Sequence, residues 1–255
     1  MNKVRQCWNE GRAALAGWLQ LPGALHAEAL ARLDYDAIVV DLQHSLIDFA
    51  AVCPMLMAIE HGGAEPFVRL QVNDPADVMK LLDAGAYGVI APMVNTGADA
   101  RRLAGALHYA PRGQRSVGPR RPSLRYGPSY VANASETFVA FAMIETREAM
   151  ANLDDILAVD GLDGVFIGPT DLALDLGHPP TVDTDERDVV SAVATILKKT
   201  KAAGRRAGIF CGSGVFARQK ILEGFDFVTA APDLAMMLGA ARSIIAEARR
   251  PKDAG

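Results

Sequence analysis

The sequence lacks an apolar run of membrane-spanning length, an excess of basic residues and a long apolar segment near its start. Lys and Arg number 26 and Asp and Glu number 30, so a net charge of -4 leaves no basic surface of the kind that binds nucleic acid. The first ten residues lack the apolar core of a secretion signal. The sequence therefore predicts a cytoplasmic protein with no membrane partner and no nucleic-acid partner.

Cysteine is also scarce, because only Cys7, Cys53 and Cys211 occur, and their spacing fits neither a disulfide framework nor a metal site. We expect them to serve as small apolar side chains in a reducing compartment. No glycine-rich phosphate turn follows the first expected strand, which argues against an open dinucleotide-binding sheet.

Strand and helix patterns alternate along the chain. Its length of 255 residues and its 50% apolar content suit one large globular domain, which we predict to span residues 1–255. Short apolar runs predict eight strands, at 15–20, 37–42, 66–70, 87–92, 139–144, 164–167, 206–211 and 226–230. Amphipathic segments between them predict helices, among them 26–33, 49–60, 75–83, 96–109, 185–203, 216–223 and 234–248. Eight such alternations predict an α/β fold, the TIM (β/α)8 barrel, with an open doubly wound sheet as the alternative.

Two of the apolar runs end in a carboxylate, Glu145 after residues 139–144 and Asp171 shortly after residues 164–167. The carboxyl ends of parallel strands share one rim of a barrel, so these two acids are expected to converge. Two carboxylates at a rim suit a hard divalent cation whose shell is completed by water and substrate oxygens. The alternative is that each acid caps the helix that follows it.

Other polar residues also lie at or directly after the ends of expected strands. Asp41 and His44 come directly after the second strand, and Arg69 lies near the end of the third. Histidine can carry a proton near neutral pH, and Asp41 could fix its tautomer. An arginine on a buried strand needs an anionic partner, which could be Glu145, Asp171 or a ligand oxygen. The alternative for His44 alone is an ordinary loop histidine.

Three further features stay open at this point. Residues 111–130 predict a long irregular loop with five arginines. These arginines could meet an acidic substrate or a neighbouring subunit, or the loop could be a solvated surface. The chain after Gly168 should open a short helix, whose free N–H groups can receive a carboxylate. The remaining histidines are predicted to lie on the surface: His26, His61, His108 and His178.

Taken in order, these motifs resemble the HpcH/HpaI aldolase family, which comprises class II aldolases of 4-hydroxy-2-oxo acids and 2-keto-3-deoxy sugar acids. The resemblance covers residues 14–245 and depends on the joint agreement of Val40-Asp41-Leu42-Gln43-His44-Ser45, Val68-Arg69-Leu70, Leu82-Asp83-Ala84-Gly85-Ala86, Ile90-Ala91-Pro92-Met93-Val94, Pro111-Arg112-Gly113-Gln114-Arg115, Ile144-Glu145-Thr146-Arg147-Glu148-Ala149 and Gly164-Val165-Phe166-Ile167-Gly168-Pro169-Thr170-Asp171-Leu172.

The resemblance implies a barrel of the phosphoenolpyruvate/pyruvate-binding type that reversibly cleaves a hydroxy-oxo acid to pyruvate and an aldehyde. Glu145 and Asp171 would hold Mg, Mn or Co, His44 would move the proton, and Arg69 would stabilise the enolate oxygen. Substrate would bind along the segment from Gly168 through Pro169 and Thr170 to Asp171, where backbone amides receive the pyruvate carboxylate.

The resemblance also implies a homo-oligomer, a hexameric trimer of dimers whose subunits exchange their last helix. Asp83 matches an acid that reaches His44 from a neighbouring subunit. Two residues depart from many relatives, Met143 in place of a glutamine and Gln43 in place of a glutamate, and Met143 bears on substrate contacts.

Three alternatives to the aldolase function stay open. The same metal site could decarboxylate oxaloacetate or cleave an acyl-CoA such as malyl-CoA or citramalyl-CoA. A catalytically silent barrel that binds a 2-oxo acid is the non-enzymatic alternative. Because no lysine ends an expected strand, a Schiff-base mechanism is not expected.

Overall fold

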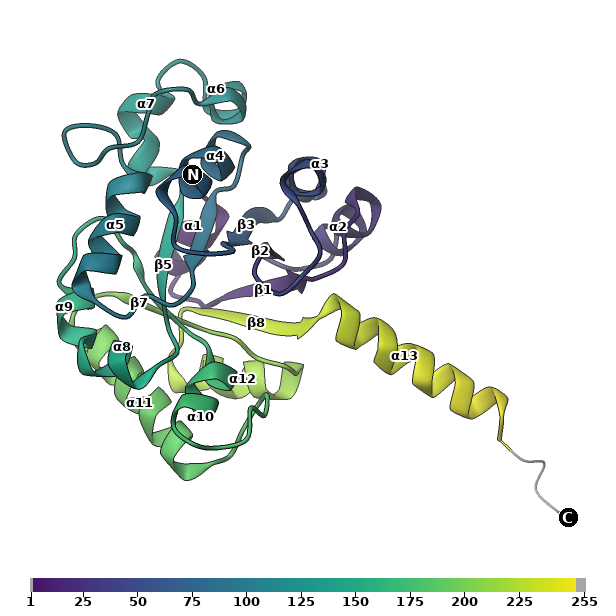
Figure 1. Ribbon diagram of the computed structural model, residues 1–255. Helices are drawn as coiled ribbons and strands as arrows, with labels where there is room; N and C mark the ends of the chain where they lie inside the picture. Colours follow the sequence, from purple (N-terminus) through teal and green to yellow (C-terminus); the bar gives the residue numbers. More distant parts are fainter. Residues whose placement is uncertain (1, 251–255) are drawn as a thin grey trace, which may run out of the picture.

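Eight short apolar segments pair side by side in chain order and close into a parallel barrel in the computed structural model, which describes residues 2–250 (Figure 1). The strands are β1 (Ala14–Leu19), β2 (Ala37–Asp41), β3 (Glu65–Arg69), β4 (Gly88–Ala91), β5 (Val139–Ile144), β6 (Gly164–Ile167), β7 (Arg206–Ile209) and β8 (Phe227–Pro232). The predicted (β/α)8 barrel is therefore confirmed, with strand bounds that differ from the predicted ones by a few residues.

The helices mostly follow the strands that they cover. They are α1 (Lys3–Asn9), α2 (Ala24–Ala31), α3 (Phe49–Gly62), α4 (Pro75–Asp83), α5 (Gly97–Leu107), α6 (Arg120–Tyr126), α7 (Tyr130–Asn133), the 3-10 turn η1 (Ala134–Glu136), α8 (Arg147–Ala151), α9 (Leu153–Leu157), α10 (Pro169–Asp175), α11 (Arg187–Ala202), α12 (Gly214–Glu223) and α13 (Asp233–Ala248). None of the helices within residues 2–250 is long and apolar enough to cross a membrane.

Aromatic side chains fill the barrel interior. Phe67 stacks on Phe227 with ring centroids 5.1 Å apart, and Phe141 lies 5.4 Å from the same ring. Alternate residues of each strand point inward, so these rings form one apolar layer, while a second apolar core lies between the strands and the surrounding helices. The strands are buried on both faces, which explains their nearly continuous apolar sequence.

The register of β3 and β4 decides where the Phe67 ring fits. Phe67 is the direct partner of Gly88, and a Cβ atom on Gly88 would lie 2.1 Å from the Phe67 ring. Position 88 therefore requires glycine because the Phe67 ring leaves no room for a side chain, and not because of the backbone angles there. The amino end of the barrel is closed by α1, whose Trp8 ring packs edge-on against Phe141.

The arginine-rich segment 111–130 differs from its prediction as an irregular loop, since it contains α6 and runs into α7. Three of its five arginines form ion pairs, Arg115 with Asp83, Arg121 with Glu60 and Arg125 with Glu65. Because Glu65 begins β3, these pairs fix the segment at the amino ends of the strands. Within one chain it therefore does not reach the carboxyl-end rim.

His108 was predicted to be a surface residue, and this prediction is wrong. Its ring is buried between Ser135 and the carbonyl of Gly161, with Nδ1 2.9 Å from Ser135 Oγ and Nε2 2.8 Å from the Gly161 oxygen. Burial lowers the pKa of His108, so the ring is neutral at pH 7. The residue follows α5 at the point where the chain turns inward, which sequence periodicity does not reveal.

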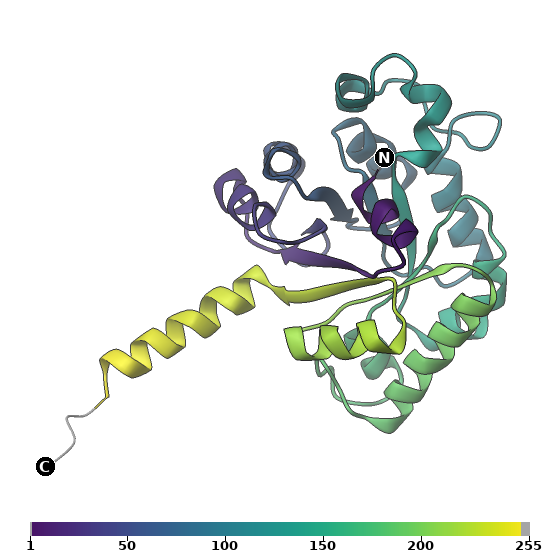
Figure 2. The same ribbon diagram turned by 180° about the vertical axis from the view of Figure 1, so that it is seen from behind.

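The last helix, α13, projects away from the barrel instead of packing against it (Figures 1 and 2). Its contacts with the strands are with β8, which precedes it, and with β1. Several large apolar side chains are exposed along it: Leu234, Met236, Met237, Leu238, Ile244 and Ile245. The last helix thus lies outside the barrel, and the predicted range also extends beyond the described residues 2–250. That residues 1–255 form a single domain therefore stays a prediction.

We expect Gly88→Ala to lower the free energy of unfolding by about 1–3 kcal/mol or more, because the new methyl group would overlap the Phe67 ring. Gly105→Ala is the matched control, since a Cβ atom at this helical position meets no atom within 4 Å. This control should leave stability unchanged or raise it by up to about 1 kcal/mol. Chemical denaturation of both variants measures the difference, and equal stabilities would contradict the packing argument.

Candidate active site

A cavity of about 240 Å³ opens at the carboxyl ends of the strands. Six residues that the sequence singled out line it: His44, Arg69, Gly168, Pro169, Thr170 and Asp171. They come from the ends of β2, β3 and β6, which the barrel brings to one rim. The strand-end rule therefore placed these residues together correctly, while the role of each stays a prediction.

Arg69 has a partner that the sequence did not predict. Its Nε and Nη2 donate to Asp41 Oδ1 and Oδ2 at 2.9 and 2.5 Å, so the guanidinium grips both carboxylate oxygens. The expected partners were Glu145, Asp171 or a ligand oxygen. The register of β2 and β3 explains the correction, because Asp41 and Arg69 lie directly opposite each other across the two strands.

Asp41 also organises the loop that carries His44, in a different way from the one expected. Its Oδ1 accepts the backbone N–H groups of Gln43 at 3.0 Å and His44 at 3.2 Å. Among the hydrogen bonds of residues 2–250, none joins the Asp41 carboxylate to the His44 ring. Asp41 is fully buried and directed inward, so it positions the His44 backbone rather than the imidazole tautomer.

Trp18, in β1, contacts both members of this ion pair. Its indole Nε1 donates to Asp41 Oδ2 at 3.2 Å, and the Arg69 guanidinium lies 4.9 Å from its ring centroid. Burial alone would raise the pKa of Asp41, but hydrogen bonding and the positive charge of Arg69 outweigh it and lower that pKa. Asp41 is therefore an anion that holds the arginine in place.

Glu145 is in the opposite electrostatic situation. Its side chain is only 1% exposed, and Oε1 accepts the backbone N–H of Met93 at 2.7 Å. Burial raises the pKa of Glu145 to about 7, and the negative charge of Asp171 adds to this rise. The Met93 N–H and the positive charge of Arg69 oppose it. The two acids are thus close enough to repel each other, and within residues 2–250 no basic side chain forms an ion pair with either.

This pair of acids fits a divalent cation. Two carboxylates without a positive partner are hard oxygen donors, and a cation between them would relieve their repulsion. Within residues 2–250, no group of three or more His, Cys, Asp or Glu side chains gathers as a complete metal site. Glu145 and Asp171 are thus the candidate carboxylate donors among the predicted site residues, and their role as metal ligands stays a prediction.

The first turn of α10 supplies donors of another kind. The helix begins at Pro169, as the sequence predicted, and the first N–H groups of a helix have no partner inside it. Thr170 and Asp171 thus present backbone N–H groups beside the cavity that their side chains line. Gly168 permits a close approach, because a Cβ there would lie 2.7 Å from Glu145 Oε2.

Asp83 lies elsewhere in the same chain. It ends α4 near the amino end of the barrel, where its Oδ1 accepts from Arg115 Nη2 at 2.8 Å. Asp83 therefore does not join His44 within one chain. A role at the site would require a second subunit, and this role stays a prediction.

Comparison with known proteins now identifies the family. The model of the HpcH/HpaI aldolase/citrate lyase family matches residues 15–242. A hydroxypyruvate/pyruvate aldolase from Rhizorhabdus wittichii is 76% identical over 249 residues, which are 98% of this chain and 99% of that protein. The chain belongs to the HpcH/HpaI aldolase/citrate lyase family.

Two further likenesses agree with this assignment. A 4-hydroxy-2-oxo-heptane-1,7-dioate aldolase from Salmonella heidelberg is 34% identical over 96% of this chain and 94% of its own. A crystal structure of a family member from Burkholderia cenocepacia superposes with a TM-score of 0.89 at 30% identity, covering 98% of this chain and 100% of that one. The protein is a carbon–carbon lyase, a class II aldolase of the HpcH/HpaI family.

Four more residues line the cavity of this HpcH/HpaI aldolase. Trp18, Gln20 and Phe210 were not among the predicted site residues, and Met143 was noted only as a departure from relatives. Trp18 and Gln20 lie at the end of β1 and Phe210 directly follows β7, so the strand-end rule could have found them. They were missed because that rule was applied only to ionisable side chains.

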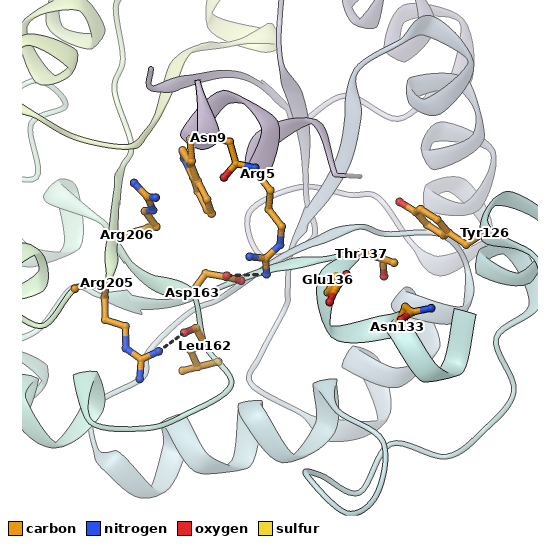
Figure 3. Close-up of a pocket in the computed structure, with 12 residues that line it drawn as sticks. Arg5, Asn9, Tyr126, Asn133, Glu136, Thr137, Leu162, Asp163, Arg205 and Arg206 are labelled. Atoms are coloured by element: carbon orange, nitrogen blue, oxygen red, sulfur yellow. Dashed lines mark hydrogen bonds and ion pairs between the residues drawn. The ribbon is translucent and has the colours of Figure 1, made fainter. Parts of the chain in front are cut away.

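A larger cavity of about 840 Å³ lies at the amino ends of β5, β6 and β7 (Figure 3). Its basic side chains already have partners: Arg5 pairs with Asp163 at 2.7 Å, and Arg205 donates to the Leu162 carbonyl at 3.0 Å. Arg206 pairs with Asp226 at 2.9 Å. This cavity does not contain the predicted residues, so size alone does not mark the active site of this aldolase.

Asp41→Asn should lower the free energy of unfolding by about 3–5 kcal/mol, because it leaves the buried guanidinium of Arg69 without a counter-ion. The double variant Asp41→Asn/Arg69→Met should recover part of this loss, since no buried charge remains. Glu28→Gln is the control: it breaks the exposed pair with Arg32 and should leave the free energy of unfolding nearly unchanged. Urea denaturation measures these three variants and Arg69→Met alone, and additive losses from the Asp41 and Arg69 substitutions would argue against a coupled pair.

Proposed function

We propose that this aldolase reversibly cleaves a 4-hydroxy-2-oxo acid, such as 4-hydroxy-2-oxoheptanedioate or a 2-keto-3-deoxy sugar acid, to pyruvate and an aldehyde. The name of the R. wittichii relative supports pyruvate or hydroxypyruvate as the oxo-acid product, and the name of the Salmonella relative supports a 4-hydroxy-2-oxo acid as the substrate. The observation that carries the proposal is the cavity at the carboxyl ends, which is lined by Asp171 and by an arginine held in a fixed orientation, with the buried Glu145 within electrostatic reach of Asp171.

We propose Glu145 and Asp171 as the ligands of a divalent ion, Mg, Mn or Co. Class II aldolases of this family are generally dependent on such a metal. When bound, the cation supplies a Lewis acid for the keto oxygen of the oxo acid. Glu145 directly follows β5, and Asp171 lines the cavity from the first turn of α10 after β6. The same turn offers the backbone N–H groups of Thr170 and Asp171 to the substrate carboxylate.

The proton and charge chemistry falls to His44 and Arg69. His44 lines the cavity and is proposed to accept the proton of the 4-hydroxyl group, directly or through a water molecule. The bond between C3 and C4 then breaks, the aldehyde leaves, and the electron pair remains on the three-carbon fragment as an enolate. Arg69 is proposed to stabilise the enolate oxygen, because its orientation is already fixed by Asp41 and Trp18.

Metal removal should abolish turnover of a hydroxy-oxo acid, and addition of Mg²⁺, Mn²⁺ or Co²⁺ should restore it. Glu145→Gln and Asp171→Asn should each lose about 100-fold or more in kcat/KM and bind Mn²⁺ more weakly, since each removes a carboxylate ligand. Asp154→Asn, which changes an exposed acid, is the control. A coupled assay for pyruvate with a panel of aldehydes measures turnover, and an undiminished rate after chelation would refute the mechanism.

Arg69→Lys should lower kcat about 100-fold with a small change in KM, because lysine keeps the charge near Asp41 but loses the planar pair of donors. Arg205→Lys, at the opposite end of the barrel, serves as the control and should keep full activity. Thermal unfolding of each variant separates catalytic loss from misfolding. Full activity of Arg69→Lys would remove Arg69 from the proposed chemistry.

We further propose that a second copy of this chain covers α13, as part of the predicted hexamer. The exposed apolar residues of α13 need a partner surface. A cavity of about 400 Å³ lies on the outside of β1 and β8, beside α12, with Leu15, Leu33 and Ile221 among its walls. This is where the helix after β8 would pack in a closed barrel, so α13 of a neighbouring subunit is its proposed occupant. The free thiols of all three cysteines agree with the cytoplasm as the proposed compartment.

Ile244→Lys should weaken this assembly, because a charge would replace an apolar residue of α13 that is 69% exposed in the single chain. Light scattering during gel filtration should give an oligomer for the unmodified protein and smaller species for the variant. Val190→Lys on α11 is the control, since it places the same charge on a partly exposed apolar position of another helix. A monomeric unmodified protein would overturn the proposed exchange.

A further inference from the structure

Met93 has an unusual backbone conformation next to the site. Its φ angle is 53°, and within residues 2–250 only Asp183 is another non-glycine residue with positive φ. The left-handed region is unfavourable for side chains with a Cβ atom, and such strain persists only where the surroundings impose it. Met93 lies in the turn between β4 and α5, two residues after the last residue of the strand.

The strain is linked to Glu145. The Met93 N–H donates to Glu145 Oε1 at 2.7 Å, and this carboxylate is almost completely buried. The Met93 side chain is 49% exposed, so packing of the side chain does not explain the conformation. The backbone of Met93, rather than its thioether, therefore makes the contact that matters at the site.

The neighbouring residues hold the turn in this shape. Asn95 Oδ1 accepts from Thr146 Oγ1 at 2.6 Å, and the Asn95 carbonyl accepts from Asn152 Nδ2 at 2.9 Å. Val94 is fully buried beneath the turn. Three hydrogen bonds thus join the segment after β4 to the segment after β5, and Met93 lies at the point where the chain must bend to meet them.

We propose that the left-handed backbone of Met93 is a positioning device for Glu145, which fixes Oε1 and leaves Oε2 as the oxygen that would hold a cation. The inference rests on the metal role proposed for Glu145. The opposite side of the carboxylate is bounded by Gly168, where an added Cβ would lie 2.7 Å from Oε2. The Met93 N–H on one side and the bare Gly168 backbone on the other leave the carboxylate a single orientation.

Substitutions at Met93 separate the backbone from the side chain. Met93→Gly and Met93→Ala keep the N–H and should bind Mn²⁺ within about twofold of the unmodified protein. Met93→Val should raise the Mn²⁺ dissociation constant about tenfold, because a β-branched residue resists positive φ most strongly. Met57→Val is the matched control, since Met57 is 50% exposed but lies in helix α3. Electron paramagnetic resonance of free Mn²⁺ measures all five proteins.

Two results in this series would overturn the inference. One is a folded Met93→Val variant that binds Mn²⁺ as tightly as the unmodified protein. The other is a loss of affinity in Met93→Gly or Met93→Ala as large as that in Met93→Val, because the side chain would then be responsible.

Amide hydrogen exchange tests the same contact without changing Met93. In metal-free protein, Glu145→Ala should speed exchange of the Met93 amide at least tenfold. The Gly212 amide, which donates to Asp183 Oδ1 at 2.7 Å, is the control and should not change. Unchanged exchange at Met93 would overturn the inference even if Met93→Val fails to fold. If the unmodified protein binds no Mn²⁺, the proposed function fails, and the exchange result still decides whether Met93 holds Glu145.

Discussion

The buried ion pair between Asp41 and Arg69 is the constraint on which the rest of the site depends. A charged arginine inside a barrel is costly unless an anion meets it, and the β2–β3 register places the aspartate directly opposite. The same carboxylate accepts the Trp18 indole N–H and the backbone N–H groups that begin the His44 loop. One anion thus orients the arginine and anchors the loop that carries His44, the proposed proton-transfer residue.

The other buried acid is left in the opposite state, and this contrast gives the site its chemistry. Asp41 is neutralised by Arg69, whereas Glu145 receives one backbone N–H and faces the charge of Asp171. A protein that only needed a stable core would not keep two repelling carboxylates at a rim. A divalent cation held by both, as proposed above, would relieve this repulsion and supply a Lewis acid.

The fold could be predicted from the sequence because parallel strands buried on both faces need continuous apolar runs, and eight such runs with helices between them close a barrel. His44, Arg69 and Asp171 were found from their positions after these runs. The position of segment 111–130 relative to the barrel could not be predicted from the sequence. It depends on ion pairs with Asp83, Glu60 and Glu65, which are distant from the segment in sequence. Burial of His108 was missed for the same reason, since Ser135 and Gly161 supply its partners.

The sequence by itself determined the barrel, the family and the rim on which the site residues gather, because strand ends of one polarity share one rim whatever the details of packing. The tertiary structure alone decided which charges pair. Strand register, invisible in a single segment, paired Arg69 with Asp41, and closure of the barrel brought Glu145 within electrostatic reach of Asp171. It also revealed the left-handed turn at Met93, because a backbone angle imposed by distant hydrogen bonds leaves no mark on the residue that adopts it.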